Sequence, residues 1–403
     1  MDKIEELLTR GVEKIYPTKE ELEKVLRSGK KLKLYQGFDP TGIQLHIGHM
    51  VGLRKLRQWQ DLGHHVIFLI GDGTGQAGDP SGKKHTREKF LTREELRKNA
   101  VDYIKQAGKI VRFEGKNPVE ILFNGDWLNE LKLADILNIA GHFTPQQLLE
   151  RDLFKERVRR EEDINLREFL YPLLQAYDSV VMEVDLEIGG SDQMFNMLCG
   201  RTLMKQMKNK DKFVMTTPLL TDSKGVKIGK TEDNIIALND KPEDLFAEIM
   251  ALPDDIILKG FEYLTDVSMD EIKNIKAKIE KGENPVPYKK RMAFEIVKQL
   301  NDEKSALSAQ ENFEQTVQGE KLPDDIPVFN FGAEAFDSGR WIEDMLISTK
   351  LAESRSEAKR LIKQGGVEVD GKKILNPEQL MPVKNTTILI KVGKRRFAKI
   401  KLD

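Results

Sequence analysis

Apolar residues in the first half of the chain alternate between the spacing of strands and the spacing of helices. Short apolar runs typical of buried strands occur at residues 34–38, 66–70 and 183–188. Between them, residues 53–62 and 93–107 repeat apolar side chains every three to four positions, which is the period of an amphipathic helix. This alternation indicates a parallel sheet that binds its ligands at the carboxyl edge of the strands.

The N-terminal 30 residues predict two short amphipathic helices ahead of the sheet. Apolar side chains recur at helical spacing from Ile4 to Ile15. Thr18 and Glu21 then form a capping box before a second apolar stripe.

The rest of the chain changes character more than once. Residues 117–178 are mainly helical, like an inserted or connecting segment, and residues 240–320 carry only helical stripes. The prolines within residues 323–327 mark a linker. The last part, from Ser338, begins with a helix, and its strands are expected near residues 367–369 and at 387–392.

Composition restricts the class of protein. With 403 residues, 39% hydrophobic and 33% charged, the chain can form several packed domains. Cys199 is the single cysteine, so neither a disulfide framework nor a cysteine-based zinc site is expected. The N-terminus is charged where a signal peptide needs an apolar run, and no apolar stretch approaches the length of a membrane span. We therefore expect a cytoplasmic protein that does not enter a membrane.

Charge is spread unevenly along the chain. The formal net charge is -1, yet the segment from Arg340 to Asp403 holds 15 Lys and Arg against 8 Asp and Glu. A basic end on an acidic body is typical of a local contact with a polyanion. A tail that only improves solubility is the alternative.

Two motifs carry candidate phosphate chemistry. The segment from His46 to His49 follows the first strand pattern, so its donors lie beside a helix N-terminus, where phosphate is favoured. The segment from Lys227 to Thr231 is a glycine-hinged loop with two lysines and a hydroxyl, which suits closure over a polyphosphate. Each motif alone has an ordinary explanation, as a helix cap or a solvated turn. Together they indicate an enzyme that activates its substrate with a nucleotide.

Six segments, in this order, make the chain similar to the bacterial-type tyrosyl-tRNA synthetases, a family of class I aminoacyl-tRNA synthetases. They are residues 35–41, 46–49, 78–83, 168–175, 189–193 and 227–231. The resemblance covers essentially the whole chain. The lysine loop departs from the common class pattern, because Gly229 and Thr231 replace its serines, which resembles the tyrosyl branch. Gly42-Ile43-Gln44 is a smaller departure that removes no chemical group.

The resemblance implies a fold in several parts. A Rossmann-like, doubly wound parallel α/β sheet would form the catalytic domain, followed by an all-α domain that binds the anticodon and a small α+β RNA-binding module. Residues 354–371 resemble a module shared with a small-subunit ribosomal protein and many pseudouridine synthases. The expected bounds are 1–30 for the N-terminal helices, 31–235 for the catalytic domain with its connecting segment at 117–178, 236–325 for the helical domain and 338–403 for the module.

The activity implied is that of a tyrosine–tRNA ligase. The enzyme would activate L-tyrosine with ATP, accompanied by Mg²⁺, and then transfer the tyrosyl group to the 3′ end of its cognate tRNA. No cluster of ligands in the sequence predicts a fixed metal site. The family also implies a homodimer formed through the connecting segment.

The chemistry of activation explains which residue types are needed. The carboxylate of the amino acid attacks the α-phosphorus and expels pyrophosphate, so catalysis requires alignment and neutralised phosphate charge rather than a protein nucleophile. The expected catalytic residues are the groups that can contact phosphate oxygens: His46, His49, Lys227, Lys230, Thr231, Lys83 and Arg87. The expected ATP-binding residues are Gly37, Asp39, Gly48, Gly190, Asp192 and Lys230.

A second group would recognise the amino acid. Tyr171, Gln175 and Asp178 have a spacing that places them on one face of a helix. By resemblance, Tyr171, Gln175 and Asp79 hold the α-ammonium of the substrate. The phenol would be met by Asp178 and Tyr35, and Gln193 would lie near the reacting carboxylate. A buried acceptor discriminates against phenylalanine, which has no hydroxyl to donate, a property known of this family.

Two other classes of protein stay open. A nucleotidyltransferase of the same superfamily would use the histidine motif on a different acid, but the Tyr171 face and the basic module argue against it. A catalytically silent RNA-binding paralogue is disfavoured, because both histidines and both lysines of the two motifs are present.

Overall fold

The computed structural model describes residues 2–79, 90–223, 225–228, 235–318, 326–331, 342–377, 387–393 and 396–402. The chain divides into two compact units, Met1–Ala306 and Leu307–Asp403. No helix among the described residues is long and apolar enough to cross a membrane.

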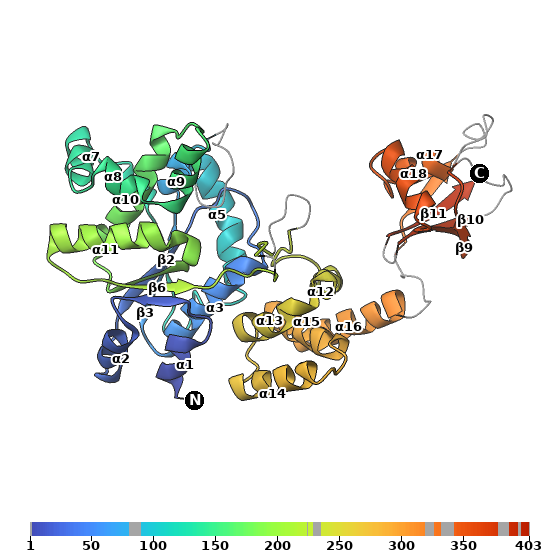
Figure 1. Ribbon diagram of the computed structural model, residues 1–403, viewed down its shortest axis with the longest axis horizontal. Helices are drawn as coiled ribbons and strands as arrows, with labels where there is room; N and C mark the ends of the chain where they lie inside the picture. The colour runs from blue at the N-terminus through green and yellow to red at the C-terminus, as the bar shows by residue number, and fades with distance from the viewer. Residues whose placement is uncertain are drawn as a thin grey trace. The chain divides into compact units, whose positions relative to one another are not determined.

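A six-stranded sheet in the order β1-β6-β5-β2-β3-β4 forms the centre of the first unit (Figure 1). The strands from β2 to β6 are parallel, and β1 pairs antiparallel with β6. The chain therefore builds outward from the centre in both directions, which confirms the expected doubly wound sheet and places its switch point between β2 and β5. The strands are β1 (Lys14–Tyr16), β2 (Lys33–Phe38), β3 (His65–Ile70), β4 (Glu120–Phe123), β5 (Leu186–Gly190) and β6 (Phe213–Thr217).

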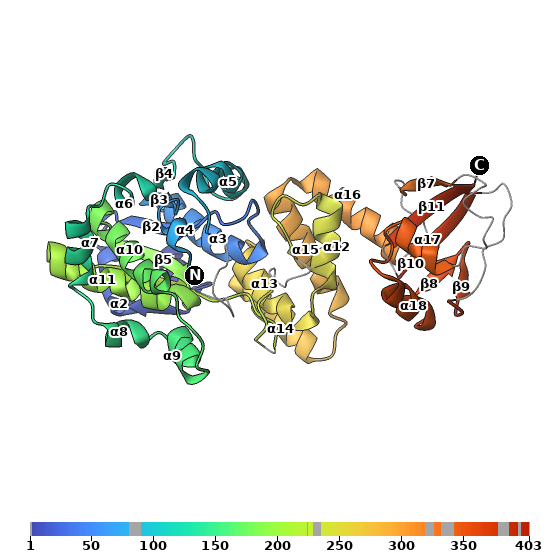
Figure 2. The same ribbon diagram turned by 90° about the horizontal axis from the view of Figure 1, so that it is seen from above.

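Helices cover both faces of this sheet (Figures 1 and 2). Gln36 of β2 lies against Gly52 of α3 (Ile47–Asp61), whereas the hydroxyl of Tyr35 lies 3.0 Å from that of Ser179 on α10 (Leu166–Met182). Because successive side chains of a strand point to opposite faces, α3 and α10 lie on opposite sides. Helix α11 (Met194–Lys208) packs beside α10.

The N-terminal part differs from the expectation in one element. Helices α1 (Lys3–Thr9) and α2 (Lys19–Arg27) are present, but the helical stripe predicted to continue to Ile15 is wrong. Ile15 lies in β1, and the amide of Glu13 donates a 2.8 Å hydrogen bond to the carbonyl of Thr216. Pairing with β6, which is distant in the sequence, makes this segment an edge strand in spite of its local helical pattern.

The connecting segment is mainly helical, as expected, although it begins with β4. Its helices are α6 (Gly125–Leu128), α7 (Leu133–Ala140), α8 (Pro145–Leu149), α9 (Asp152–Arg159) and most of α10. The strand expected at 183–188 begins later, because Glu183 adopts a left-handed conformation (φ 49°) at the end of α10. Two helices outside this segment also flank the sheet, α4 (Thr74–Ala77) and α5 (Arg93–Ala107).

Within the part expected to be helical throughout, residues 240–320, the described residues from Pro242 to Gln318 form helices joined by turns. Helices α12, α13, α14 and α15 gather side by side (Figure 2). Leu245 and Phe246 of α12, Phe261 of α13 and Ile296 of α15 are fully buried. The bounds are α12 (Pro242–Ala251), α13 (Ile257–Leu264), α14 (Met269–Glu280), α15 (Val286–Leu300) and α16 (Glu303–Phe313).

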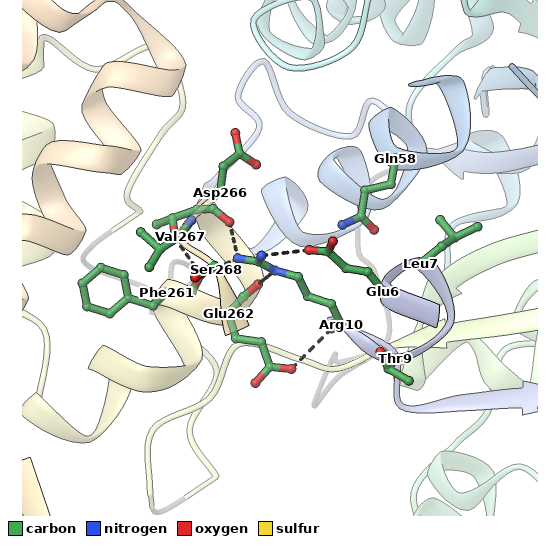
Figure 3. Close-up of polar contacts among 12 residues, drawn as sticks. Glu6, Leu7, Thr9, Arg10, Gln58, Phe261, Glu262, Asp266, Val267 and Ser268 are labelled. Carbon is green, nitrogen blue, oxygen red and sulfur yellow. Dashed lines mark hydrogen bonds and ion pairs between the residues drawn. The ribbon is translucent and has the colours of Figure 1, made fainter. Parts of the chain in front are cut away.

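Arg10 joins this helical part to the sheet part of the same unit (Figure 3). Its guanidinium donates to the carbonyl oxygens of Glu262 at 2.9 Å, Phe261 at 3.1 Å and Thr265 at 2.5 Å, and pairs with Glu6 at 3.1 Å. Carbonyls at the end of a helix have no partner within it, so a buried cation satisfies them and opposes the helix dipole. The end of α13 is thereby fixed to the end of α1.

The second unit contains a five-stranded sheet in the order β7-β11-β10-β8-β9, with α17 (Ile342–Ser348) and α18 (Arg355–Lys363) packed on one apolar core. The strands expected at 367–369 and 387–392 are β8 and β10, which confirms the α+β prediction. Strand β7 pairs parallel with β11, and the other pairs are antiparallel. The strands are β7 (Val328–Phe331), β8 (Val367–Val369), β9 (Lys372–Ile374), β10 (Thr387–Val392) and β11 (Arg396–Leu402).

Candidate active site

The two histidines of the first motif cap helix α3 together. His46 is the N-cap, and its Nδ1 accepts from the amide of Gly48 at 3.1 Å, while Nδ1 of His49 accepts from the amide of His46 at 3.1 Å. The ring centroids lie 3.9 Å apart. A neutral imidazole whose Nδ1 accepts carries its proton on Nε2. The fold thus assigns both rings a tautomer whose Nε2 donates.

Gly48 has a packing reason to be glycine. A Cβ built there would lie 2.9 Å from Cε1 of His46 and 3.7 Å from the carbonyl oxygen of Ile228. A side chain would therefore displace the His46 ring. The same distances show that the described part of the lysine loop lies directly beside the histidine motif.

Hydrogen bonds at the start of the lysine loop and after its end hold the described residues of this segment beside the histidine motif. At the start, the amide of Ile228 donates to the carbonyl of Leu220 at 2.8 Å. After it, the amide of Ile47 donates to the carbonyl of Ile236, and the amide of Leu238 to that of Leu45, each at 2.9 Å. The two motifs of the sequence therefore converge at the start of α3.

Lys227 is the lysine of the loop that the structure describes. Its Nζ donates a 2.8 Å hydrogen bond to Oδ2 of Asp192, and both side chains are partly exposed. Asp192 follows Gly190, the last residue of β5, and Gly37 lies near the end of the neighbouring strand β2. The predicted residues Gly229, Lys230, Thr231, Lys83 and Arg87 lie outside the described residues.

Asp39, directly after β2, is held by groups from two helices. Its Oδ1 accepts from Oγ1 of Thr74 at 2.7 Å, and its Oδ2 accepts from the hydroxyl of Tyr171 at 2.9 Å. Burial and the charges of Asp39 and Asp79 raise the pKa of Tyr171 well above its usual value, so this hydroxyl stays a donor.

The carboxyl of Asp178 is buried in a small polar cage on α10. Its Oδ2 accepts from Nδ2 of Asn124 at 2.9 Å, and its Oδ1 from Nε1 of Trp127 at 2.8 Å. Burial raises the pKa of Asp178 well above its usual value, and these two hydrogen bonds oppose that rise. Sequence reasoning missed both donors, although an Asn-Gly-Asp-Trp turn at 124–127 directly follows an apolar strand and could have been noticed.

Tyr35 makes no hydrogen bond to Asp178 in this structure. Its hydroxyl lies 3.0 Å from that of Ser179, the residue after Asp178. Burial, and then the charges of Glu187 and Asp178, raise the pKa of Tyr35 well above its usual value.

Two of the residues expected at the α-ammonium, Asp79 and Gln175, belong to one hydrogen-bonded chain with Gln193, which was expected near the carboxylate. Nε2 of Gln193 donates to Oδ2 of Asp79 at 2.8 Å. Nδ2 of Asn196 on α11 donates to Oε1 of Gln193 at 2.8 Å and to Oε1 of Gln175 at 3.0 Å. Asn196 is fully buried and was not expected from the sequence. The structure thus brings Asp79, Gln175 and Gln193 together around a side chain from a fourth element.

The chain is similar to known proteins over most of its length. Residues 27–318 match the model of a family described as tRNA synthetases class I (W and Y). The chain belongs to this family of class I tRNA synthetases. Residues 341–381 match the S4 domain, so the synthetase carries this module in its second unit.

Relatives of this synthetase match it over nearly their whole length. The tyrosine–tRNA ligase of Dehalococcoides mccartyi strain CBDB1 is 41% identical over 400 residues, which are 99% of this chain and 98% of the relative. The tyrosine–tRNA ligase of Thermotoga maritima is 40% identical over 396 residues, 98% of this chain and 96% of the relative.

Solved structures show the same fold as this synthetase. A C-terminally truncated mitochondrial tyrosyl-tRNA synthetase from Aspergillus nidulans has a TM-score of 0.64 at 24% identity, and the match covers 78% of this chain and 93% of that one. The tyrosyl-tRNA synthetase from Archaeoglobus fulgidus complexed with L-tyrosine has a TM-score of 0.62 at 22% identity, covering 77% and 100%.

Within the described residues of the synthetase, no group of three or more His, Cys, Asp or Glu side chains could hold a metal ion. A magnesium ion that accompanies ATP takes most of its ligands from phosphate oxygens and water, so a site for Mg–ATP requires no protein cage. Asp39 and Asp192 are two carboxylates at this edge of the sheet, and each follows one of the two central strands.

Proposed function

We propose that this synthetase is a tyrosine–tRNA ligase, which activates L-tyrosine with ATP and transfers the tyrosyl group to the 3′ end of its cognate tRNA. The observation that carries the proposal is the position of Asp178. A buried carboxylate on the same helix as Tyr171 and Gln175 suits a substrate that has a hydroxyl at one end and an ammonium at the other. Relatives about 40% identical over almost the whole chain carry this activity in their names.

The nucleotide would lie at the switch point, between the ends of β2 and β5. Nε2 of His46 and Nε2 of His49 would donate to phosphate oxygens from the start of α3. Lys227 would leave Asp192 for the leaving pyrophosphate, together with Lys230 and Thr231. Asp192 would then accept from the ribose hydroxyls. Magnesium would supply charge neutralisation on the phosphates when it is bound.

Lys83 and Arg87 would add positive charge from the segment after Asp79, and Gly37 and Gly190 would let the nucleotide approach the strand ends. No protein group needs to accept a proton in the first step, because the amino acid's own carboxylate is the nucleophile and pyrophosphate leaves as an anion. The role of the fold is to align the two substrates.

The amino acid would lie along α10. Asp79, Tyr171 and Gln175 would hold its ammonium, and Gln193 would lie near its carboxylate. Its phenol would reach Asp178 and Tyr35. Phenylalanine has no hydroxyl to donate and would form no hydrogen bond with this acceptor, so discrimination needs no editing step.

The second unit would hold tRNA. Arg360 and Lys363 lie exposed on α18, the helix within the S4 match. Lysine and arginine on a helix followed by a strand suit contacts with the phosphate backbone. Residues 236–325 would bind the anticodon.

A homodimer formed through the connecting segment is part of the proposal. Large apolar side chains are exposed on α7 and at the start of α10, namely Leu133, Ile136, Leu137, Leu166 and Leu170. A hollow of about 280 Å³ lies among these helices. Exposed apolar patches of this kind mark interaction sites. Leu137→Asp should shift the sedimenting species from dimer to monomer, and a dimer unchanged in that variant would place the interface elsewhere.

ATP–pyrophosphate exchange over a panel of amino acids, followed by tRNA charging on the same preparation, tests the activity. A tyrosine–tRNA ligase gives exchange that depends on tyrosine and charges tyrosine-accepting tRNA. A nucleotidyltransferase acting on another acid gives no exchange that depends on an amino acid, and a silent RNA-binding paralogue gives no exchange at all. The protein is expected to act in the cytoplasm.

A further inference from the structure

A buried ion pair lies behind the residues proposed to bind the amino acid. Nζ of Lys212, just before β6, contacts Oε2 of Glu187 on β5, and their side chains are 0% and 2% exposed. Nζ of Lys212 also donates to Oγ of Ser179 at 2.8 Å. None of these three residues was expected from the sequence to have a role.

The neighbouring helix makes room for this pair. A Cβ built on Gly200 of α11 would lie 2.5 Å from Nζ of Lys212 and 3.0 Å from Oγ of Ser179. Glycine is therefore required where the ammonium sits. Removing two charges from water is costly, and apolar residues of the same volume often give equal stability. Packing alone does not explain an ion pair at this depth.

Glu187 contacts the ammonium-binding group directly. Its Oε1 accepts from Nε2 of Gln175 at 3.0 Å. An ionised carboxylate can only accept, so the amide of Gln175 must turn its NH₂ toward Glu187 and its oxygen the other way. That orientation is the one an α-ammonium needs, because an ammonium can only donate. A neutral amide in place of Glu187 would remove this constraint and leave the hydrogen bond from Asn196 to Oε1 of Gln175 as the other group that orients the amide.

Ser179 links the same pair to the other end of the substrate. Its Oγ accepts from Lys212 and lies 3.0 Å from the hydroxyl of Tyr35, with Oε2 of Glu187 at 3.4 Å. The ammonium of Lys212 occupies one acceptor position of the Ser179 hydroxyl and so restricts where its proton can point. Gln175 and Tyr35, which would contact the two ends of the amino acid, are therefore both linked to the buried pair of Lys212 and Glu187.

We propose that the Lys212–Glu187 pair is a positioning device for substrate recognition. Lys212 pairs with Glu187 and holds its carboxylate in place, Glu187 holds the Gln175 oxygen toward the substrate's amino group, and Ser179 extends the constraint to Tyr35. The proposal rests on the proposed function, because it takes Gln175 and Tyr35 as contacts of the amino acid. Neither Lys212 nor Glu187 touches the reacting atoms, so both act through other residues.

Three variants of the full-length protein test this inference: Glu187→Gln, Lys212→Met and the double variant with both changes. Amino-acid-dependent exchange gives kcat and the KM for tyrosine and for ATP, and urea unfolding gives stability. Glu187→Gln should raise the KM for tyrosine roughly tenfold, the scale of one hydrogen bond to a charged group, with the KM for ATP within about twofold. Lys205→Met is the matched control. Lys205 lies on α11 and forms an exposed ion pair with Asp211, so its loss should change neither KM.

The double variant separates positioning from packing. Lys212→Met alone leaves a buried carboxylate without its cation and should unfold at a lower urea concentration, and the neutral double variant should recover much of that loss. The tyrosine KM should nevertheless stay raised in the double variant, because the acceptor-only group is still missing. A tyrosine KM that returns to the wild-type value together with stability would overturn the proposal and leave the pair a structural role.

The wild-type amino-acid panel keeps this test separate from that of the proposed function. Should the wild type activate a different amino acid, the proposed function fails, and the same variants are then compared on that substrate, since the Gln175 oxygen would face any α-ammonium. An unchanged KM for the activated amino acid in Glu187→Gln refutes the positioning role in either case.

Discussion

The hydroxyl of Tyr171 donates a 2.9 Å hydrogen bond to Oδ2 of Asp39, and this contact ties helix α10 to the end of strand β2. Asp39 belongs to the residues expected at ATP, and Tyr171 to those expected at the amino acid. The two substrate sites therefore meet at this hydrogen bond. The proposed reaction requires such a meeting point, because the carboxylate of one substrate attacks the α-phosphorus of the other.

Tyr171→Phe should lower kcat/KM for tyrosine in pyrophosphate exchange by roughly 10- to 100-fold, since it removes one hydrogen bond to a charged group. Tyr177→Phe is the control, because Tyr177 lies on the same helix but packs in an apolar cluster of α10 and α11. Equal activity of the two variants would remove Tyr171 from the binding group.

Asp178→Asn should narrow the preference for tyrosine over phenylalanine, because an amide oxygen is a weaker acceptor than a carboxylate. The NH₂ group of the new amide would also face a donor, either Nδ2 of Asn124 or Nε1 of Trp127. Exchange with the two amino acids gives the ratio of kcat/KM values. Trp127→Phe removes one donor to the carboxyl while the carboxyl stays, so its ratio should fall less. Discrimination that stays intact in Asp178→Asn would show that the phenol is recognised elsewhere.

Lys230→Ala should reduce the rate of adenylate formation by roughly 10²- to 10³-fold with little change in tyrosine affinity, the usual scale for the loss of one donor to a transition-state charge. Single-turnover kinetics with equilibrium binding of tyrosine separates the two quantities. Lys205→Ala, an exposed lysine of α11, serves as the control. Weakened tyrosine binding with an intact chemical step would contradict the assignment.

Replacing Arg360 and Lys363 together by Gln should weaken tRNA binding and reduce the slope of log affinity against log salt. A protein that contacts fewer phosphates releases fewer counterions when it binds. Both side chains lie exposed on α18, and neither has an ion pair among the described residues, so stability should hold. Filter binding at several salt concentrations measures the slope. Pyrophosphate exchange should be unchanged, and unchanged tRNA affinity would show that this face of the module does not contact RNA.

His64 should make the first unit less stable in acid. Burial lowers the pKa of His64 from 6.5 to about 4, and its Nδ1 accepts from the amide of Leu32 at 3.1 Å. Between these pH values the unfolded chain binds more protons than the folded one, so stability rises with pH in this window and is fully present above about 6.5. A whole proton corresponds to about 1.4 kcal/mol per pH unit.

His64→Asn keeps an acceptor and removes the titration. Urea midpoints of both proteins between pH 4 and 8 should therefore differ in slope only below the ordinary pKa of histidine. If the stability of both proteins changed with pH in parallel throughout, the pKa of His64 would be the same in the folded and unfolded chains, and the prediction would be wrong.

Much of the fold followed from local patterns along the sequence. The apolar runs at 34–38 and 66–70 became β2 and β3, and the stripe at 93–107 became α5 with the predicted bounds. Side-chain period and capping residues are local properties, so the sequence alone determined these elements. It also placed the histidine motif at the start of a helix and Tyr171, Gln175 and Asp178 on one helix.

Only the tertiary structure decided what surrounds those residues. Ile15 fitted a helical stripe, but its strand partner lies about 200 residues away in β6. Asn124 and Trp127 meet Asp178 from a separate turn, and Lys212 is in sequence one more lysine of a charged segment. Its burial against Glu187 depends on how β5, β6 and α11 pack. Contacts between distant elements leave no periodic trace in either segment, so spacing cannot reveal them until the chain has folded.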